Sequence, residues 1–240
     1  MTDANHDQQC QYSPKIIDQS YWNDRWLSGK IGFNRLTVNK HFDKHILSKI
    51  SSIDQQQCVL FPLCGKTVDM KAVLDAGHRV IGIEYVQLGV EAFFEETNIA
   101  HEILTDEENK CQIYQGIDRP VTIYCTNFLT FNQPLPPIDW IFDRGGFVAV
   151  NVSEREQYRD RLLEVMTPKH TQLYLLASCY DQSDFHGPPR CVSPEDIDRL
   201  FGESCSTKLV EAIDTTIEFN QHNNQKLRRM EEHLHLIIRK

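Results

Sequence analysis

The sequence lacks the long apolar runs that mark membrane and secreted proteins. No segment approaches the roughly 20 apolar residues needed to span a bilayer, and the longest apolar stretches, such as 138–142 and 173–177, have the length of a strand. Residues 1–13 are polar, without the basic start and apolar centre of a secretory signal. We therefore expect a cytoplasmic protein without a membrane partner, and residues 1–20 as a flexible tail.

Paired cysteines and an excess of positive charge are also absent. The eight cysteines contain no CxxC pair, and the ten histidines show no clear ligand spacing, so we expect mostly buried, reduced thiols and no metal site. The formal net charge of −9 argues against broad nucleic-acid binding, which depends on Lys and Arg side chains neutralising phosphates. We expect a monomer with a small-molecule partner and no nucleic-acid partner.

The apolar pattern predicts one α/β domain, which we place at residues 21–240. A chain of 240 residues fits a single core of this class, and short apolar runs alternate with segments of helical periodicity. The fold class is therefore α/β, with a Rossmann-like, doubly wound, mainly parallel seven-stranded sheet and an antiparallel C-terminal strand. The expected strands are 58–62, 79–84, 121–126, 138–142, 172–178, 209–219 and 232–238.

Two helix starts have local signatures. Ser153 and Glu156 match the S/T-x-x-E capping box and predict a helix between Val152 and Pro168. Ser193 followed by Pro194 predicts a short helix that ends near Gly202. Further helices are expected at 21–27, 37–50, 68–74 and 88–96.

Two strand ends carry groups that suit an adenosine-containing ligand. Gly65, after the first strand, permits close approach of the backbone. Glu84 follows 19 positions later, the spacing of an acidic residue that accepts hydrogen bonds from ribose hydroxyls. The G-x-G-x-x-G pattern of NAD-binding loops is missing, and S-adenosylmethionine, which has no phosphate, suits a loop with one glycine better. An ordinary turn and a strand-end carboxylate would also explain both residues.

Several motifs, in chain order, resemble the thiopurine S-methyltransferase family. The similarity runs from about residue 21 to residue 240, and the W-x-x-x-W, F-P-L-C-G-K and D-R-G blocks are specific in combination. It implies S-adenosylmethionine-dependent methyl transfer to the sulfur of a small heteroaromatic thiol. The motifs are Tyr21-Trp22-Asn23-Asp24-Arg25-Trp26 with Gly29-Lys30 and Phe33, Phe61-Pro62-Leu63-Cys64-Gly65-Lys66, Gly82-Ile83-Glu84, Phe142-Asp143-Arg144-Gly145-Gly146, and Gly187-Pro188-Pro189 with Arg199-Leu200-Phe201-Gly202.

The resemblance implies a set of cofactor-binding residues. An N-terminal aromatic segment would close over the cofactor and substrate, the loop after the first strand would contact the methionine portion, Glu84 would hold the ribose, and an Asn-Phe pair would contact the adenine. Without the resemblance, we would interpret the aromatic residues as packing between the helix and the core, and the Asn as a turn residue. The set is Trp22, Trp26, Phe33, Leu63, Gly65, Glu84, Asn127, Phe128 and Arg144.

On the acceptor side, the resemblance makes Arg144 the active-site arginine, where a surface ion pair is the alternative. Asp143 would orient Arg144 or relay a proton, or else cap the next turn. Phe33 and Arg190 complete the expected substrate-binding residues. Gln221 stands where mammalian members carry a second substrate-side arginine, and Arg190 stands where an aromatic residue is usual.

Two other functions stay open at this point. The same fold could methylate another soft nucleophile, such as selenide, telluride, halide or a small amine. The chain could also be a non-catalytic cofactor-binding protein, since a fold alone does not establish activity. An NAD-dependent oxidoreductase is disfavoured by the missing glycines.

Overall fold

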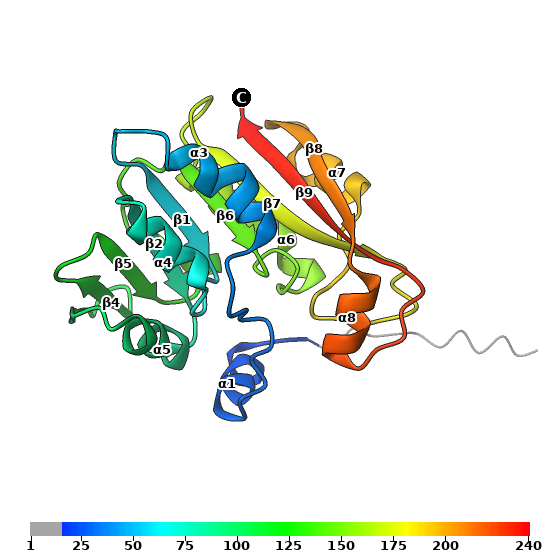
Figure 1. The fold of residues 1–240 in the computed structure, drawn as a ribbon, viewed down its shortest axis with the longest axis horizontal. Helices are drawn as coiled ribbons and strands as arrows, with labels where there is room; N and C mark the ends of the chain where they lie inside the picture. Colours follow the sequence, from blue (N-terminus) through cyan, green and yellow to red (C-terminus); the bar gives the residue numbers. More distant parts are fainter. Residues whose placement is uncertain (1–15) are drawn as a thin grey trace, which may run out of the picture.

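The computed structural model describes residues 16–240 (Figure 1). Residues 1–15 of the expected tail, with Cys10, lie outside the described residues. Ile17, which the expected tail also included, is buried, and the Asp18 carboxylate accepts the Tyr21 N–H at 3.1 Å and caps α1 (Gln19–Leu27). The folded chain therefore includes the last residues of that segment.

A nine-stranded sheet forms the centre of the described chain. Its order is β3-β4-β5-β2-β1-β6-β7-β9-β8, in which the five strands from β5 to β7 pair in parallel, so the expected mainly parallel sheet is confirmed. The strands are β1 (Cys58–Pro62), β2 (Arg79–Glu84), β3 (His101–Asp106), β4 (Cys111–Gly116), β5 (Val121–Cys125), β6 (Trp140–Arg144), β7 (Gln172–Tyr180), β8 (Cys205–Asp214) and β9 (Met230–Arg239).

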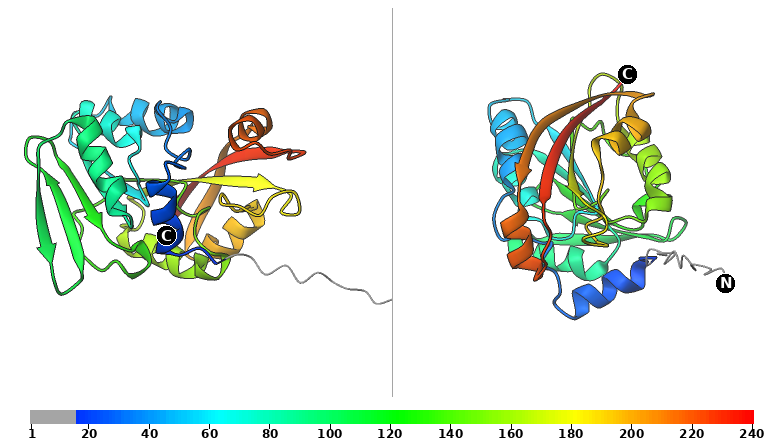
Figure 2. Two further views of the ribbon diagram at one scale, coloured as in Figure 1. Left: turned by 90° about the horizontal axis from the view of Figure 1, so that it is seen from below. Right: turned by 90° about the vertical axis from the view of Figure 1, so that its right-hand side faces the viewer.

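Helices cover both faces of the sheet (Figure 2). One apolar cluster joins the segment 40–50, α4 and α5 to one face, and a second joins α6 and α7 to the other. α1 and α8 instead lie at the lower end of the sheet in Figure 1. The helices are α2 (Lys40–Phe42), the π-helical η1 (Asp43–Leu47), α3 (Ser48–Ile50), α4 (Val68–Asp75), α5 (Gln87–Thr97), the 3-10 turns η2 (Phe128–Thr130) and η3 (Val152–Glu154), α6 (Arg155–Val165), α7 (Pro194–Phe201) and α8 (Thr216–Asn223).

The strand count differs from the expected seven because β3 and β4 add an antiparallel hairpin beyond β5. The C-terminal antiparallel pair is confirmed as β8 and β9. The expectation that residues 209–219 form one strand is wrong beyond Asp214, because residues 216–223 turn into α8.

The expected capping box at Ser153 is also wrong. The box is formed two residues earlier, where the Asn151 N–H donates to the Glu154 carboxylate at 3.1 Å. Asn151 is as good a cap as Ser153, and it has buried partners besides. The predicted helix start at Ser193 with Pro194 is confirmed, and the structure adds Asp196 as the reciprocal partner of a capping box.

The described cysteines are all free thiols, and Cys58, Cys64, Cys111 and Cys205 are buried, as expected.

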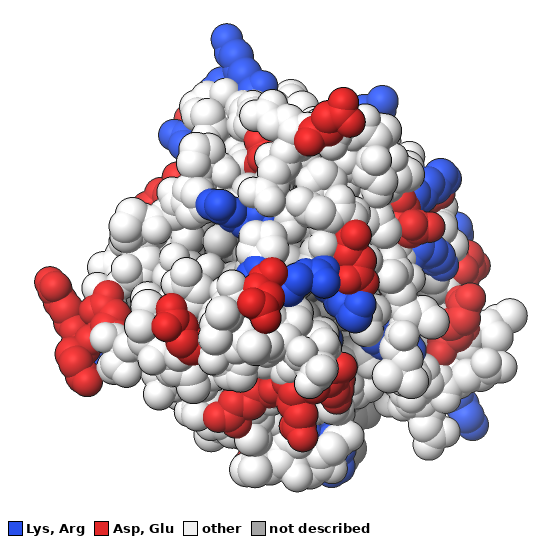
Figure 3. Space-filling view, turned by 60° about the vertical axis from the view of Figure 1, so that its left-hand side comes forward, with Lys and Arg blue, Asp and Glu red and all other residues white. Residues whose placement is uncertain are grey.

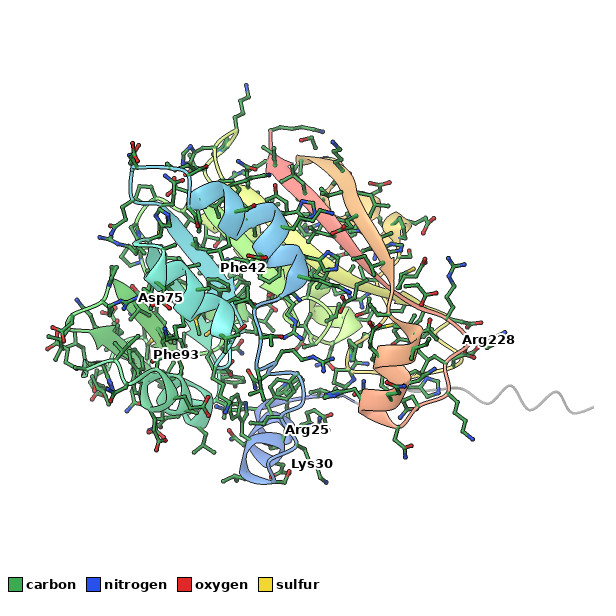
Figure 4. All side chains as sticks on the ribbon, in the orientation of Figure 1. Arg25, Lys30, Phe42, Asp75, Phe93 and Arg228 are labelled. Atoms are coloured by element: carbon green, nitrogen blue, oxygen red, sulfur yellow. The ribbon has the colours of Figure 1, made fainter. Side chains whose placement is uncertain are left out.

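Phe42 packs against β1 and β6, with its ring 5.0 Å from that of Phe142 (Figure 4). None of the helices within residues 16–240 has the length and apolar composition that a membrane crossing requires. On the face shown in Figure 3, Lys and Arg side chains are interspersed with Asp and Glu.

Candidate active site

A cavity of about 430 Å³ opens beyond the carboxyl ends of the parallel strands. The chain adds strands on one side of β1 and then crosses to β6 on the other. Open α/β sheets bind ligands in the crevice at such a switch point. The volume lies within the range of small-molecule sites. The walls come from the loops after β1, β2, β5 and β6, from β7 and β9, and from residues 16–35 with α8.

Glu84 ties two of these strand ends together. The N–H of Gly65 donates to one carboxylate oxygen at 2.7 Å, and the N–H of Val86 donates to the other at 2.8 Å. Burial raises the pKa of Glu84, although these backbone donors act in the opposite direction. Each oxygen keeps lone pairs beyond the single backbone bond it accepts, so Glu84 can receive two further donors from the cavity.

The loop after β1 has an unusual backbone at two positions. Leu63 has φ of 47° and Gly65 has φ of 53°. Residues with a side chain rarely adopt this left-handed backbone region. A Cβ on Gly65 would lie 2.8 Å from Oδ1 of Asn34. Both residues line the cavity, so the chain bends here to bring its backbone close to a ligand.

Residues 16–35 form the cover of the cavity. The rings of Trp22 and Trp26 both meet Phe33 edge-on, with centroids 5.7 and 5.9 Å apart, and all three line the cavity. Trp26 lies against α5, where a Cβ on Gly89 would approach its ring to 2.8 Å. The three aromatic residues are therefore brought together as expected.

A few hydrogen bonds join the cover to the rest of the domain. Asn151 accepts from the Ile17 N–H at 2.9 Å and donates to the Ile17 carbonyl at 2.8 Å. The Gly32 carbonyl lies 3.0 Å from Nε2 of His222 on α8. Oδ1 of Asn34 accepts the Lys66 N–H at 3.2 Å. No local sequence pattern predicts these contacts, because their partners lie far apart along the chain.

Arg144 connects the floor of the cavity to the cover. It ends β6, lines the cavity, and donates from Nη1 to the Phe33 carbonyl at 2.6 Å. Burial lowers the pKa of Arg144, and the negative charges of Asp69 and Glu232 partly oppose this. An arginine remains protonated under such a shift, so the cavity holds a fixed positive charge at the end of β6.

The Asn127-Phe128 pair follows β5 at the cavity wall. Oδ1 of Asn127 accepts the Leu129 N–H at 2.9 Å and begins the turn η2. Phe128 is buried, with its ring 4.8 Å from that of Tyr158. Asn127 is thus both the turn residue and a cavity residue, and its amide nitrogen is the group available to donate to a ligand.

Two expected acceptor-side residues lie behind the cavity wall. Asp143 is buried, and its Oδ1 accepts the N–H groups of Gly146 and Phe147 at 3.2 and 3.0 Å, which is the turn-capping alternative. Arg190 is buried as well and donates to Oδ1 of Asn151 at 3.0 Å. Neither side chain lines the cavity.

Gln221 is exposed on α8, whereas its neighbour His222 reaches the cavity.

Other cavity residues went unrecognised in the sequence. Asp69 is buried at the start of α4, where its carboxylate accepts the Asn39 N–H at 2.8 Å. Glu232 on β9 is the second. The period of two along β9 places Glu232 on the same face as the apolar Leu234 and Leu236, so a carboxylate on a core face was the available signal. Arg25 and Arg35, from the cover, also line the cavity.

Solved structures define the class of fold. The chain superposes on the Burkholderia thailandensis 1,6-didemethyltoxoflavin-N1-methyltransferase with a TM-score of 0.58 and 12% identity, covering 95% of this chain and 93% of that one. That protein was solved with S-adenosylhomocysteine and its acceptor bound. The fold is therefore one that methyltransferase domains share.

Sequence comparisons give the family. The thiopurine S-methyltransferase family model matches residues 17–240. The chain is 33% identical over 230 residues to the thiopurine S-methyltransferase of Canis lupus familiaris, covering 94% of this chain and 91% of the dog protein. It is 31% identical to the probable thiopurine S-methyltransferase of Danio rerio, covering 94% and 97%. The chain belongs to the thiopurine S-methyltransferase family, and the expected class, an S-adenosylmethionine-dependent S-methyltransferase, is confirmed.

Proposed function

We propose that the cavity holds S-adenosylmethionine against β1, β2 and β5 and presents its methyl group to a small heteroaromatic thiol, such as a thiopurine, near Arg144. Glu84, with lone pairs left on both oxygens, would receive the ribose hydroxyls. The bent backbone at Leu63 and Gly65 would lie along the methionine portion. Asn127 and Phe128 would contact the adenine.

The observation that carries the acceptor side is a group of three arginines. Arg25, Arg35 and Arg144 line the cavity, and within residues 16–240 none of them has a carboxylate oxygen within the 4.0 Å of an ion pair. Guanidinium groups that lack a carboxylate partner favour an anionic or electron-rich ligand. A thiolate, or the polarised sulfur of a thione, meets that description.

The chain itself contributes position and shielding rather than covalent chemistry. Bound S-adenosylmethionine supplies an already activated methyl group. The strand-end residues would fix the cofactor, Arg144 would hold the acceptor sulfur, and the cover would exclude water from both. A small-molecule acceptor is the partner this proposal requires; a monomer in the cytoplasm stays a prediction from the sequence.

Titration calorimetry with S-adenosylhomocysteine and with NADH tests the cofactor site without the need for an acceptor. We expect micromolar binding of S-adenosylhomocysteine alone. The same binding in Arg144→Ala, with kcat/KM for 6-mercaptopurine lowered by about 10²-fold, would place Arg144 at the acceptor. Arg228→Ala is the matched control, because Arg228 is exposed and paired with Asp184 away from the cavity (Figure 4). Equal turnover in all three proteins would refute the assignment.

A further inference from the structure

Glu232 and His41 form a contact beside the cavity that the roles above leave unused. Glu232 lines the cavity, and its Oε2 lies 3.4 Å from Nε2 of His41. His41 is fully buried on α2, and among the described residues its Nε2 has no well-directed hydrogen bond. A buried polar atom without a hydrogen bond destabilises the folded chain. A proton taken up between the two groups would remove this destabilisation.

The opposite nitrogen of the same ring is firmly held. Nδ1 of His41 lies 2.8 Å from Oε2 of Glu211 on β8. Glu211 also contacts Lys44 at 2.6 Å and His45 at 3.0 Å. The hydrogen bond from Lys44, above all, lowers the pKa of Glu211 to about 2. An ionised Glu211 keeps the proton on Nδ1, which leaves Nε2 as the atom that can accept one from the side of Glu232.

Two departures from regular backbone meet at this contact. Lys44 and His45 belong to the π-helical η1, and the pairing of β8 with β9 shifts register between Leu209 and Glu211. π-turns and β-bulges redirect side chains and are frequent at functional sites. Here one irregularity carries the partners of Glu211 and the other carries Glu211 itself.

The groups lead in order from the cavity to solvent. Glu232 faces the cavity, His41 is fully buried behind it, and Glu211 follows at the outer side of β8. The side chain of Lys44, which binds Glu211, is 63% exposed. A proton taken from a ligand therefore has two successive acceptors, Glu232 and Nε2 of His41, and the carboxylate of Glu211 lies behind them.

We propose that Glu232 takes the acidic proton of the acceptor and that His41 relays it toward Glu211; this rests on the proposed methyl transfer to a thiol. The S–H bond of a thiol, or the N–H bond of a thione tautomer, breaks, its electron pair stays on the acceptor, and the proton forms an O–H bond on Glu232. The proton then moves from the Glu232 oxygen to Nε2 of His41, whose ring becomes an imidazolium held between the carboxylates of Glu232 and Glu211. The thiolate electron pair would then form a bond to the methyl carbon of bound S-adenosylmethionine. The bond between that carbon and the cofactor sulfur would break, and the sulfur would keep its electron pair.

The charges around Glu232 explain why a second group is needed. Burial acts to raise the pKa of Glu232, but His41 and Arg144 outweigh burial and hold this pKa below its ordinary value. A carboxylate of low pKa is a weak terminal base, so the proton needs an onward acceptor, and Nε2 of His41 is the atom within reach. The charged and titratable groups around the pair are Arg35 of the cover, Lys40, Lys44 and His45 on segment 40–50, Asp69 on α4, Arg144 on β6 and Glu211 on β8.

Two acceptors of different acidity separate proton removal from binding. At about pH 7, 4-nitrothiophenol is a thiolate and phenylmethanethiol is a thiol. We expect Glu232→Gln to lower kcat/KM for phenylmethanethiol by about 10²-fold and to change that for 4-nitrothiophenol by less than about 3-fold. The loss should shrink as the pH rises toward the pKa of phenylmethanethiol. Glu231→Gln, on the neighbouring residue, which pairs with Arg229 outside the cavity, is the control and should match wild type with both acceptors.

The outcomes distinguish this relay from the proposed function. Equal losses for the two thiols, or a loss that does not vary with pH, would overturn the relay and leave Glu232 a structural residue. A wild-type protein that binds S-adenosylhomocysteine yet methylates neither these thiols nor 6-mercaptopurine would instead overturn the proposed function. Unchanged S-adenosylhomocysteine affinity in Glu232→Gln shows that the variant is folded.

A spectroscopic readout tests the relay without turnover. In the complex with S-adenosylhomocysteine, ¹⁵N-labelled His41 should shift to imidazolium values when phenylmethanethiol binds to wild type or Glu231→Gln. The shift should be absent in Glu232→Gln, and His41→Gln identifies the signal. An unchanged His41 ring in the saturated wild-type complex would contradict proton transfer to His41.

Discussion

The floor of the cavity and its cover are held by different kinds of contact. On the floor, parallel strand pairing fixes the ends of β1 and β2, and Glu84 binds a backbone N–H beyond each. The cover rests on ring contacts and single hydrogen bonds, and α1 contains no buried residue. Segments with few buried contacts open at low free energy. We therefore expect the floor to set the geometry of the ligands and the cover to control their access.

Removing Glu84 should break the floor and give the largest effect. In Glu84→Ala the Gly65 and Val86 N–H groups lose their acceptor, and the proposed ribose site loses its carboxylate. We expect S-adenosylhomocysteine to bind at least about 100-fold more weakly, since each unpaired buried group costs about 1–3 kcal/mol. Calorimetry measures this, with Glu91→Ala on the exposed side of α5 as the control. Affinity within about threefold of wild type would mean that Glu84 only shapes the loop.

Asp143 is a second buried carboxylate at the floor, and it supports the turn after β6 instead of lining the cavity. Burial raises the pKa of Asp143 to about 6, although the N–H of Phe147, the Tyr158 hydroxyl and the N–H of Gly146 act against it. An unfolded Asp ionises near pH 3.9. The folded state thus binds more protons, and the stability that Asp143 contributes is full below about pH 4 and is lost as the pH rises through about 6.

Asp143→Asn should remove this pH dependence. Relative to the variant, wild type should lose up to about 3 kcal/mol of unfolding free energy between about pH 4 and pH 7. Urea unfolding across that range gives the difference, and parallel curves would contradict the raised pKa. Turnover should change little, because Asp143 does not line the cavity. A folded variant that binds the cofactor but loses turnover would restore the role expected for Asp143 from the sequence, which is to orient Arg144 or relay a proton.

The floor was largely predictable from the sequence and the hairpin beside it was not. β1 and β2 are buried along nearly their whole length and read as continuous apolar runs. β3 is exposed at almost every position, so burial imposes no pattern on it, and its structure depends on pairing with β4 along its whole length. Thr216 and Ile217 favour a strand as residue types, yet they begin α8, because packing of Phe219 below the sheet outweighs that preference.

In the candidate site, too, the residues of the floor could be predicted from the sequence and the contacts of the cover could not. The resemblance named Glu84, Leu63 and Arg144, which follow strands and line the cavity. The hydrogen bonds of the cover could not be predicted, because Ile17 and Asn151 are 134 positions apart and a chain of this fold brings them together only after the sheet has formed. Asp143 and Arg190 carry the right chemical groups, but their side chains point into supporting contacts that a linear motif does not reveal.

The contact between Gly89 and Trp26 allows the cover to be disturbed while the floor stays intact. A Cβ at Gly89 would lie 2.8 Å from Cζ2 of Trp26, so α1 must move away in Gly89→Ala. Gly89 lies within α5, where Ala is favoured over Gly by about 1 kcal/mol, and global stability should not fall. We expect S-adenosylhomocysteine to bind about tenfold more weakly, and trypsin to cleave faster at Arg25 and Lys30 of the cover (Figure 4).

The double variant Gly89→Ala with Trp26→Phe shows whether the clash is the cause. A smaller ring leaves room for the methyl group, so the two changes should compensate: affinity in the double variant should be higher than the product of the single effects predicts. Additive effects, or a Gly89→Ala protein with wild-type affinity and cleavage rate, would mean that Trp26 does not seat the cover on α5. In that case the hydrogen bonds from Asn151, His222 and Arg144 would hold the cover alone, and its closure would depend on β6 and α8 rather than on the aromatic residues.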